Sequence, residues 1–284
     1  MKTLATDNFM LFLDDEADIV ASDRPGLPVA AKKGHVVSSY REVLKKVAAL
    51  HFHNPRFKLL FRGQGKDYKL NIRGEKGVHS CLYPTIFRPH SSKPRKDLLD
   101  ARFQILLSAE KLLKERVSER AIWDHQLVRW AILQHYGVCD TPLLDVTQSL
   151  QIALSFACGN GEDEGFLYVL AFPQLTGPIS VALESLTQVI DLSPVCPPQA
   201  LRPHFQTGVL VGDYPTVTHR EVSHDGKGMI GNSFACRLLT KFRLTNCRSW
   251  VQEGFSATPY NILFPDQDDE WFPVMQKIKG DIVA

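Results

Sequence analysis

The sequence lacks the signatures of several common classes of protein. No run of 18 or more apolar residues occurs in the 284 residues, so no transmembrane helix is predicted. The first twenty residues contain one short apolar patch, Phe9 to Leu13, and lack the basic region, long apolar region and cleavage site of a signal peptide. We therefore expect a cytoplasmic protein that does not contact a membrane.

Metal and disulfide motifs are also missing. The six cysteines are widely scattered without a CxxC pair, and the ten histidines include no HExxH motif. The simplest interpretation is reduced thiols, as in most cytoplasmic proteins, and no bound metal.

Three motifs of nucleotide and ester chemistry are absent as well. The chain contains no GxxxxGK[ST] phosphate loop, no GxGxxG fingerprint and no GxSxG nucleophile elbow. The stretch at 62–70, RGQGKDYKL, has two glycines but no third at the required spacing. Any activity must therefore use a less common set of residues.

The net charge of +2 conceals an uneven distribution. Residues 54–96 contain eleven Lys or Arg and two Asp or Glu, a local balance of +9, whereas acids gather at 14–18 and 266–270. A basic block beside apolar strands suits a polyanion, either a nucleic acid or a dinucleotide pyrophosphate. The alternative is a solvated basic loop.

Residue patterns in the first half predict mainly helices. We expect an N-terminal arm or loop over 1–36 and a single domain over 37–284. A helix starts near Ser39, which has capping-box spacing to Glu42, and a strand at 56–61 follows it. Helices are predicted at 97–117 and 121–137, with Gly137 as the C-terminal cap, and at 149–158, with Ser149 as the N-cap. A short strand, 141–147, separates the last two.

Short strands dominate the second half. The firmest is at 164–172, with others at 178–183, 189–192, 208–214 and 237–245. The glycine-rich stretch 212–232 reads as a mobile loop, and 246–255 as a helix. This segregation predicts an α+β fold, in which the helical first half packs on a mixed or antiparallel sheet.

Polar residues interrupt the apolar pattern at two places in the first half. Arg62 and Gln64 follow a strand that enters the core, and Arg62 suits a phosphate or carboxylate with its planar fork. The alternative is a structural ion pair. His135 and Tyr136 crowd the end of an apolar helix, where a histidine is also favoured by the helix dipole.

Two further stretches show the same feature. Asp145 and Thr147 point to one face of a strand, and Asp145 can pair with Arg62 or Arg88, or simply orient the loop that follows. Gln206 precedes a strand; its neutral amide can orient a hydroxyl but cannot take a proton.

Together these stretches resemble the FRG domain family, named for its Phe-Arg-Gly motif. Residues 61–70 and 82–88 are similar to its opening arginine motif and the Phe-Arg downstream. Residues 133–158, LQHYGVCDTPLLDVTQSLQIALSFAC, resemble its central signature. The family's next strand, its Arg…Gln-x-Gly segment and its closing motif resemble 164–172, 201–211 and 262–266, so the resemblance covers about residues 55–275.

The chain departs from the family pattern at two positions. Leu143 stands where the family commonly has an arginine, and Val146 where it usually has a tryptophan. Val146 keeps its position apolar and Leu143 makes its position apolar, so the fold should survive, but loss of the arginine could change the ligand or weaken a phosphate contact.

The order of motifs is also similar to that of the ADP-ribosyltransferase superfamily. This resemblance implies a split β-sheet core and NAD as a substrate that is used without a metal. It implies catalytic roles for Arg62, Gln64, Asp145, Thr147 and Gln206. It implies NAD contacts for Phe61, Gly63, Arg88, His135, Tyr136 and Arg202, in which Phe61 or Tyr136 would stack on nicotinamide.

The weak point of that comparison is the carboxylate. Cleavage of the nicotinamide bond develops positive charge on the ribose, which requires negative potential near C1′. Gln206 is neutral, so Asp145, Glu221 and Glu253 remain alternatives, with Glu221 a candidate acid on the acceptor side.

These resemblances imply an enzyme that transfers ADP-ribose to a macromolecular acceptor, either a protein or a nucleic acid. Such an enzyme would serve as a toxin or anti-phage defence effector, and an antitoxin or inhibitor would be its partner. A second hypothesis is a non-catalytic module that binds nucleic acid or a nucleotide through the basic block. A third makes Arg62 and Asp145 a core ion pair.

Overall fold

The computed structural model describes residues 26–71, 77–88, 95–159, 161–174, 176–216 and 234–283. The chain divides into two compact units, each assembled from three segments. Unit 1 comprises residues 1–82, 147–174 and 233–260, and unit 2 comprises 83–146, 175–232 and 261–284. We describe each unit by itself.

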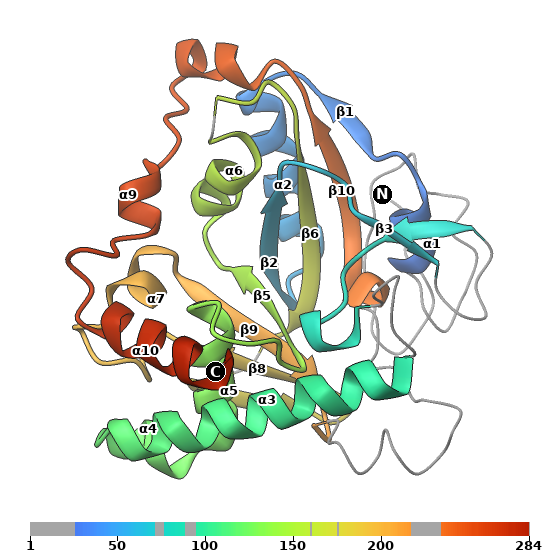
Figure 1. Cartoon of the computed structure of the whole chain (residues 1–284). Coiled ribbons are helices and arrows are strands. Elements are labelled where there is room, and N and C mark those ends of the chain that lie inside the picture. The colour runs from blue at the N-terminus through green and yellow to red at the C-terminus, as the bar shows by residue number, and fades with distance from the viewer. Residues whose placement is uncertain are drawn as a thin grey trace. The chain divides into compact units, whose positions relative to one another are not determined.

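Unit 1 is built on a mixed sheet with the strand order β1-β10-β6-β2 (Figure 1). Strand β2 (Phe57–Gln64) pairs antiparallel with β6 (Gly165–Pro173) along its whole length. Strand β10 (Leu238–Leu244) is antiparallel to β6, and β1 (His35–Val37) is parallel to β10. Because β6 lies between two partners, its residues 167–172 are all buried, which explains its continuous apolar sequence.

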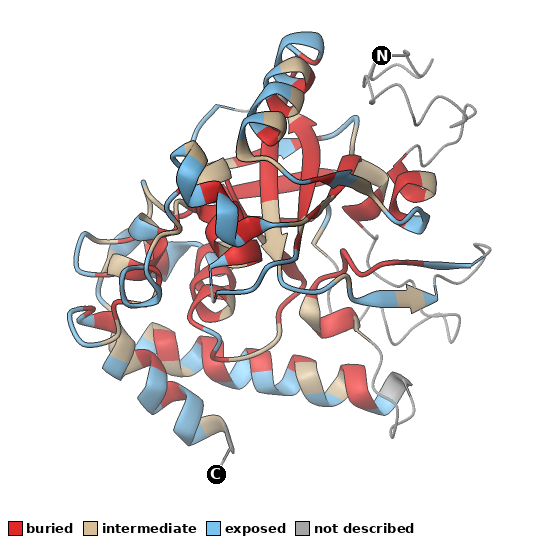
Figure 2. Ribbon diagram, turned by 90° about the horizontal axis from the view of Figure 1, so that it is seen from above, coloured by how far each residue is buried: buried red, intermediate tan, exposed pale blue. Residues whose placement is uncertain are grey.

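Helices and a hairpin complete unit 1. They are α1 (Gly26–Ala31), α2 (Tyr40–His53), α6 (Leu150–Cys158), η3 (Phe234–Arg237), η4 (Cys247–Glu253) and the hairpin β3 (Lys69–Asn71) with β4 (Val78–Ser80). Helix α2 buries Val43, Val47 and Leu50, which recur at helical spacing. Figure 2 shows this division between buried and exposed faces along the helices.

Unit 2 has a sheet with the order β5-β9-β8-β7 and a set of helices. Its strands are β5 (Leu143–Thr147), β7 (Ile179–Ala182), β8 (Thr187–Asp191) and β9 (Gly208–Asp213), although Thr147 itself belongs to unit 1. Its helices are η2 (Thr85–Phe87), α3 (Arg95–Arg116), α4 (Arg120–Asp124), α5 (Gln126–His135), α7 (Leu201–Phe205), α9 (Tyr260–Leu263, with Tyr260 in unit 1) and α10 (Trp271–Val283). Strand β8 pairs antiparallel with both β7 and β9.

The coarse prediction of an α+β fold with a mixed sheet is confirmed, and several local predictions are corrected. The helix predicted at 121–137 is two helices, α4 and α5, separated at His125. Within the predicted arm, residues 26–31 form α1 and residues 35–37 form β1. The helix predicted at 246–255 is the 3₁₀ helix η4. Most of the loop predicted at 212–232 lies outside the described residues.

The expected capping box at the start of α2 is not formed. The hydroxyl of Ser39 donates to Glu253, which also accepts a hydrogen bond from the backbone N–H of Arg41. Ser149 does cap α6 as predicted, since its Oγ accepts from the backbone N–H of Ile152. In the described part of the chain, none of the helices has the length and apolar character needed to cross a bilayer.

The expectation that all thiols are reduced is wrong for two cysteines. Cys158, at the end of α6, and Cys247, at the start of η4, form a disulfide within unit 1. The other four cysteines form no disulfide. The two partners lie 89 residues apart in the sequence, and nothing in their spacing indicated that they would pair.

Candidate functional site

The second half of strand β2, next to β6 in the unit 1 sheet, carries the Phe-Arg-Gly motif. Gly63 faces α6 so closely that a Cβ atom there would lie 1.7 Å from the carbonyl oxygen of Ala153. Successive side chains of a strand point to opposite faces, so Arg62 and Gln64 lie on the face away from α6. Both are half-buried. The motif therefore combines a close contact with the helix on one face and a cation on the other.

On its second edge, β2 meets the end of β5. Phe61 pairs with Thr147 in antiparallel register. The Thr147 hydroxyl accepts a hydrogen bond from the backbone N–H of Ser149, which fixes the turn into α6. Thr147 and Arg62 are thus both in unit 1 and lie one residue out of register on neighbouring strands, so their side chains point to opposite faces of the sheet.

A row of polar side chains crosses the sheet from Arg62. Arg62 is in register with Tyr168 of β6, and Tyr168 is in register with Lys241 of β10. Directly opposed residues share a face. Burial, together with the charge of Asp67 and a hydrogen bond to it, raises the pKa of Tyr168 far above its usual range, while the charge of Arg62 acts in the opposite direction. Arg62 is therefore within electrostatic reach of this row.

Lys241, the buried cation at the end of this row, was not predicted from the sequence. The Lys241 side chain is fully buried and donates to Asp67 and Ser80, each at 2.9 Å, and to the carbonyl oxygens of Ala30 and Lys32. Burial lowers the pKa of Lys241 to about 8, and Asp67 opposes that shift. A lysine in the middle of the apolar strand 238–244, together with one of the few acids in the basic block, was the available signal.

The basic block is divided between the two units. Residues 54–82 belong to unit 1 and residues 83–96 to unit 2. In unit 1, Arg56, Lys66 and Lys69 are exposed, and Lys69 pairs with Asp67 at 2.8 Å. In unit 2, Arg88 is half-buried and its Nε donates to the carbonyl oxygen of Tyr83.

Unit 2 holds a carboxylate–imidazole pair made of two predicted site residues. The Nδ1 atom of His135, at the end of α5, lies 3.3 Å from Oδ2 of Asp145 on β5. The His135 side chain is 1 % exposed and that of Asp145 is 33 % exposed. Neither ring nitrogen of His135 has a hydrogen bond of good geometry within the described residues. The pair thus presents a solvent-accessible carboxylate backed by a buried imidazole.

The start of β9 closes over this imidazole. A Cβ atom at Gly208 would lie 2.7 Å from Cε1 of His135, so no larger residue fits there without displacing the ring. Gly208 belongs to the Arg…Gln-x-Gly segment quoted for the family resemblance. The structure therefore brings together the histidine of one motif and the glycine of another.

Arg202 and Gln206 contact the segment of the closing motif. Arg202 donates to Asp266 at 2.6 Å, and its guanidinium lies over the rings of Tyr136, Phe264 and Phe272 at 4.9–5.5 Å from their centres. Nε2 of Gln206 donates to the carbonyl oxygen of Leu263 at 2.6 Å. Both side chains are buried and position the segment 263–269.

The two aromatic residues expected to stack on nicotinamide are both buried. Phe61 is 3 % exposed and Tyr136 is 2 % exposed. The Tyr136 hydroxyl donates to Asp269 at 2.7 Å, and burial followed by that contact raises its pKa far above the usual range. A stacking role for either ring would require the side chain to move.

Among the alternative acids, Asp145 fits a chemical role best. Glu253 is engaged at the start of α2 with Ser39 and Arg41, and hydrogen bonds from Arg41 and Ser39 lower its pKa. Glu221 lies outside the described residues. Asp145 is partly exposed and adjoins an imidazole, which makes it the described acid that can face a ligand.

Comparison with known proteins gave one match. No curated protein and no solved structure matches the chain. The family model matches residues 58–165, which include the Phe-Arg-Gly motif and the central signature, but not Arg202, Gln206 or the closing motif. Over residues 58–165, therefore, the predicted resemblance is confirmed: this part of the chain matches the FRG domain.

Proposed function

We propose that the protein binds NAD and transfers its ADP-ribose to a macromolecular acceptor. The observation that carries this proposal is the position of Arg62, a half-buried cation on strand β2, with Thr147 on the adjoining strand end. The order of the sequence motifs resembles that of the ADP-ribosyltransferase superfamily, and this resemblance, which implies a split core, is the second ground for the proposal.

Arg62 is assigned the role of anchor. A planar guanidinium binds the oxygen atoms of a pyrophosphate in a bidentate manner, and a half-buried site strengthens that attraction. Gln64, on the same face of β2 as Arg62, would hold Arg62 or a ribose hydroxyl in place. Rigid positioning of the ribose lowers the barrier to reaction because little orientational freedom remains to be lost.

Asp145 is assigned the role of carboxylate. In the reaction, the bond between C1′ and the nicotinamide nitrogen breaks, and its electron pair leaves with neutral nicotinamide. The acceptor nucleophile then bonds to C1′ and gives up a proton. A carboxylate stabilises the positive charge that develops on the ribose and can accept this proton, and His135 holds it in place at 3.3 Å.

The exposed cations of unit 1 favour a second candidate function, which is binding of a nucleic acid or nucleotide without catalysis. Arg56 and Lys66 are exposed near the ends of β2, and neither has an acidic partner among the described residues. Affinity that falls steeply with added salt, without nicotinamide release, is the outcome expected from this function.

The test is incubation of the protein with NAD and candidate protein and nucleic-acid acceptors. The wild type should release nicotinamide and label an acceptor. Arg62→Ala and Arg62→Lys should both reduce turnover, by roughly 10²-fold or more, because lysine lacks the bidentate fork. Asp145→Asn should also reduce turnover, whereas the exposed Arg56→Ala should retain it.

Thermal unfolding of each variant separates this proposal from a purely structural role for Arg62. An Arg62→Lys protein that melts like the wild type and has lost turnover supports the anchor. Wild-type protein that releases no nicotinamide with any acceptor contradicts the proposed activity. Loss of folding in both Arg62 variants favours the core ion pair instead.

A further inference from the structure

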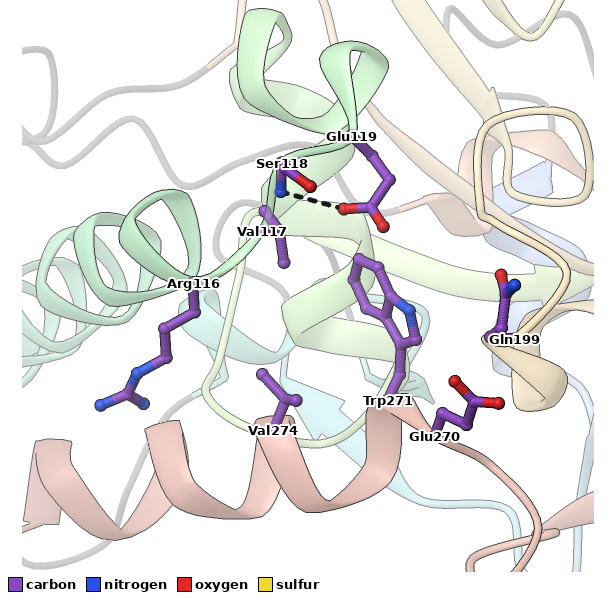
Figure 3. A pocket seen from close by; sticks show the side chains of 8 residues that line it. All are labelled: Arg116, Val117, Ser118, Glu119, Gln199, Glu270, Trp271 and Val274. Carbon is purple, nitrogen blue, oxygen red and sulfur yellow. Dashed lines mark hydrogen bonds between the residues drawn. The ribbon is translucent and has the colours of Figure 1, made fainter.

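Unit 2 contains a cavity of about 320 Å³ at the start of α10. Its walls come from the end of α3, the start of α4, Gln199 and the first residues of α10 (Figure 3). This volume is near the lower limit of about 300 Å³ for ligand pockets, so it suits one side chain better than a dinucleotide.

Two carboxylates face the cavity without a cation. Neither Glu119 nor Glu270 forms an ion pair with another described residue, and the Glu119 carboxylate accepts a hydrogen bond from the backbone N–H of Ser118. The charge of Arg116, which also lines the cavity, is compensated by Asp281. The cavity therefore has a net negative lining.

The aromatic wall of the cavity carries a hydrogen-bond donor without an acceptor. Trp271 is only 7 % exposed, yet its Nε1–H has no acceptor among the described residues. By contrast, Nε1 of Trp250 donates to Ser38 and Nε1 of Trp130 donates to Glu110. In Figure 3, the Trp271 ring lies between Glu119 on one side and Glu270 with Gln199 on the other. The indole N–H of a largely buried tryptophan usually has a protein partner, so this one is left available to a ligand in the cavity.

We propose that this cavity binds a lysine or arginine side chain of another polypeptide. The cation lies over the Trp271 ring, where the negative charges of Glu119 and Glu270 attract it, and a backbone carbonyl of the same peptide accepts from Trp271 Nε1. A simple amine supplies the cation but no acceptor, and therefore binds more weakly. This inference does not depend on NAD chemistry and goes beyond it, since it names a protein partner with a basic segment.

The test follows the four tryptophan indole N–H signals by ¹H–¹⁵N NMR, with Trp271→Phe identifying the signal of Trp271. The probes are capped tripeptides with a central lysine, arginine or norleucine, together with butylamine and spermidine. The lysine and arginine peptides should shift the Trp271 signal and leave the Trp250 signal unchanged. The norleucine peptide should have no effect.

Paired variants provide the control. The double variant Glu119→Gln with Glu270→Gln should weaken peptide binding about tenfold or more at low salt. Glu184→Gln, an exposed acid of unit 2 outside the cavity, should leave binding unchanged. Unaltered signals of the other tryptophans show that the variants are folded.

Two results would overturn the proposal. One is that no basic peptide shifts the Trp271 signal of the wild type. The other is that butylamine or spermidine binds as tightly as the peptides. The cavity would then be a site for free amines, and the peptide carbonyl would contribute nothing to binding.

Discussion

A single lysine, Lys241, has its whole side chain buried in unit 1 and is surrounded by oxygen atoms. Its contacts with Asp67, Ser80 and two carbonyl groups join strand β10 to α1 and to the segment before β3. A buried charge is tolerated only when it is paired and hydrogen-bonded, so Asp67 is the residue on which this cluster depends.

Replacement of Asp67 by asparagine should therefore be strongly destabilising. The change leaves the Lys241 ammonium group buried without a counterion, and the free energy of unfolding should fall by roughly 3–5 kcal/mol. Urea denaturation measures this loss. The matched control is Glu164→Gln, since Glu164 pairs with Arg243 at the surface and its loss should cost about 1 kcal/mol or less.

The Asp67→Asn variant should also differ from the wild type in how its stability depends on pH. Burial raises the pKa of Asp67, but hydrogen bonds from Lys69, Ser80 and Lys241 outweigh it and lower the pKa below its usual value of 3.8. A carboxyl whose pKa is depressed by folding stabilises the folded state above pH 3.8 and loses that effect as the pH falls through the folded pKa. Asp67→Asn should lack this acid-dependent component, and identical acid profiles for variant and wild type would contradict the assignment.

At the level of elements, the contact between β2 and α6 depends on one glycine. A Cβ atom at Gly63 would overlap the Ala153 carbonyl, which is backbone and cannot rotate away. A Cβ atom at Gly65, by contrast, would have no other atom within 4 Å. Gly63→Ala should lower the free energy of unfolding by about 1–3 kcal/mol or more, because α6 must shift. Gly65→Ala is the control and should be nearly neutral. Equal stability of the two variants in urea would show that the helix adjusts freely.

The sequence predicted elements well where the signal is local. Strands β2 and β6, helix α3, the Ser149 cap and the Gly137 helix end all follow from short patterns that need no distant partner. Their formation depends on hydrophobic spacing and on turn chemistry that neighbouring residues supply.

The division between α4 and α5 could not be predicted in this way. No proline or glycine marks His125. The carbonyl groups of Ile122 and Trp123, at the end of α4, are satisfied by the guanidinium of Arg129, which Glu110 of α3 holds at 2.7 Å. The break thus depends on a buried ion pair between helices, and sequence spacing does not encode such a partner.

The candidate site shows the same limit. Arg62, Asp145 and Thr147 stood out as polar residues within apolar runs, and the structure gives each a defined environment. The Lys241 cluster and the packing of Gly208 on His135 were not predicted, because both join segments more than 70 residues apart. Tertiary contacts of this kind leave no local pattern.

At the scale of the whole molecule, the disulfide connects two distant segments of unit 1. Cys158 and Cys247 are 89 residues apart in the sequence, and closing a loop of that length stabilises a folded chain by about 4.6 kcal/mol in the chain-entropy estimate. A reducing agent should therefore lower the melting temperature of the wild type. The double variant Cys158→Ser with Cys247→Ser should melt at the lower temperature with or without reductant. Titration of six free thiols in unreduced, denatured protein would contradict the pairing.

Each unit is assembled from three separate segments of the chain, so the residues that match the family model do not form a complete unit. The match to the FRG domain starts in β2, passes through all of 83–146 in unit 2, and ends at Gly165, the first residue of β6. A chain cut at that boundary would keep β2 but lose its long antiparallel partner, and an uncovered strand edge of this kind recruits other chains. The segment that matches the family model is thus shorter than the sheet to which β2 belongs, and a fragment limited to residues 58–165 should aggregate.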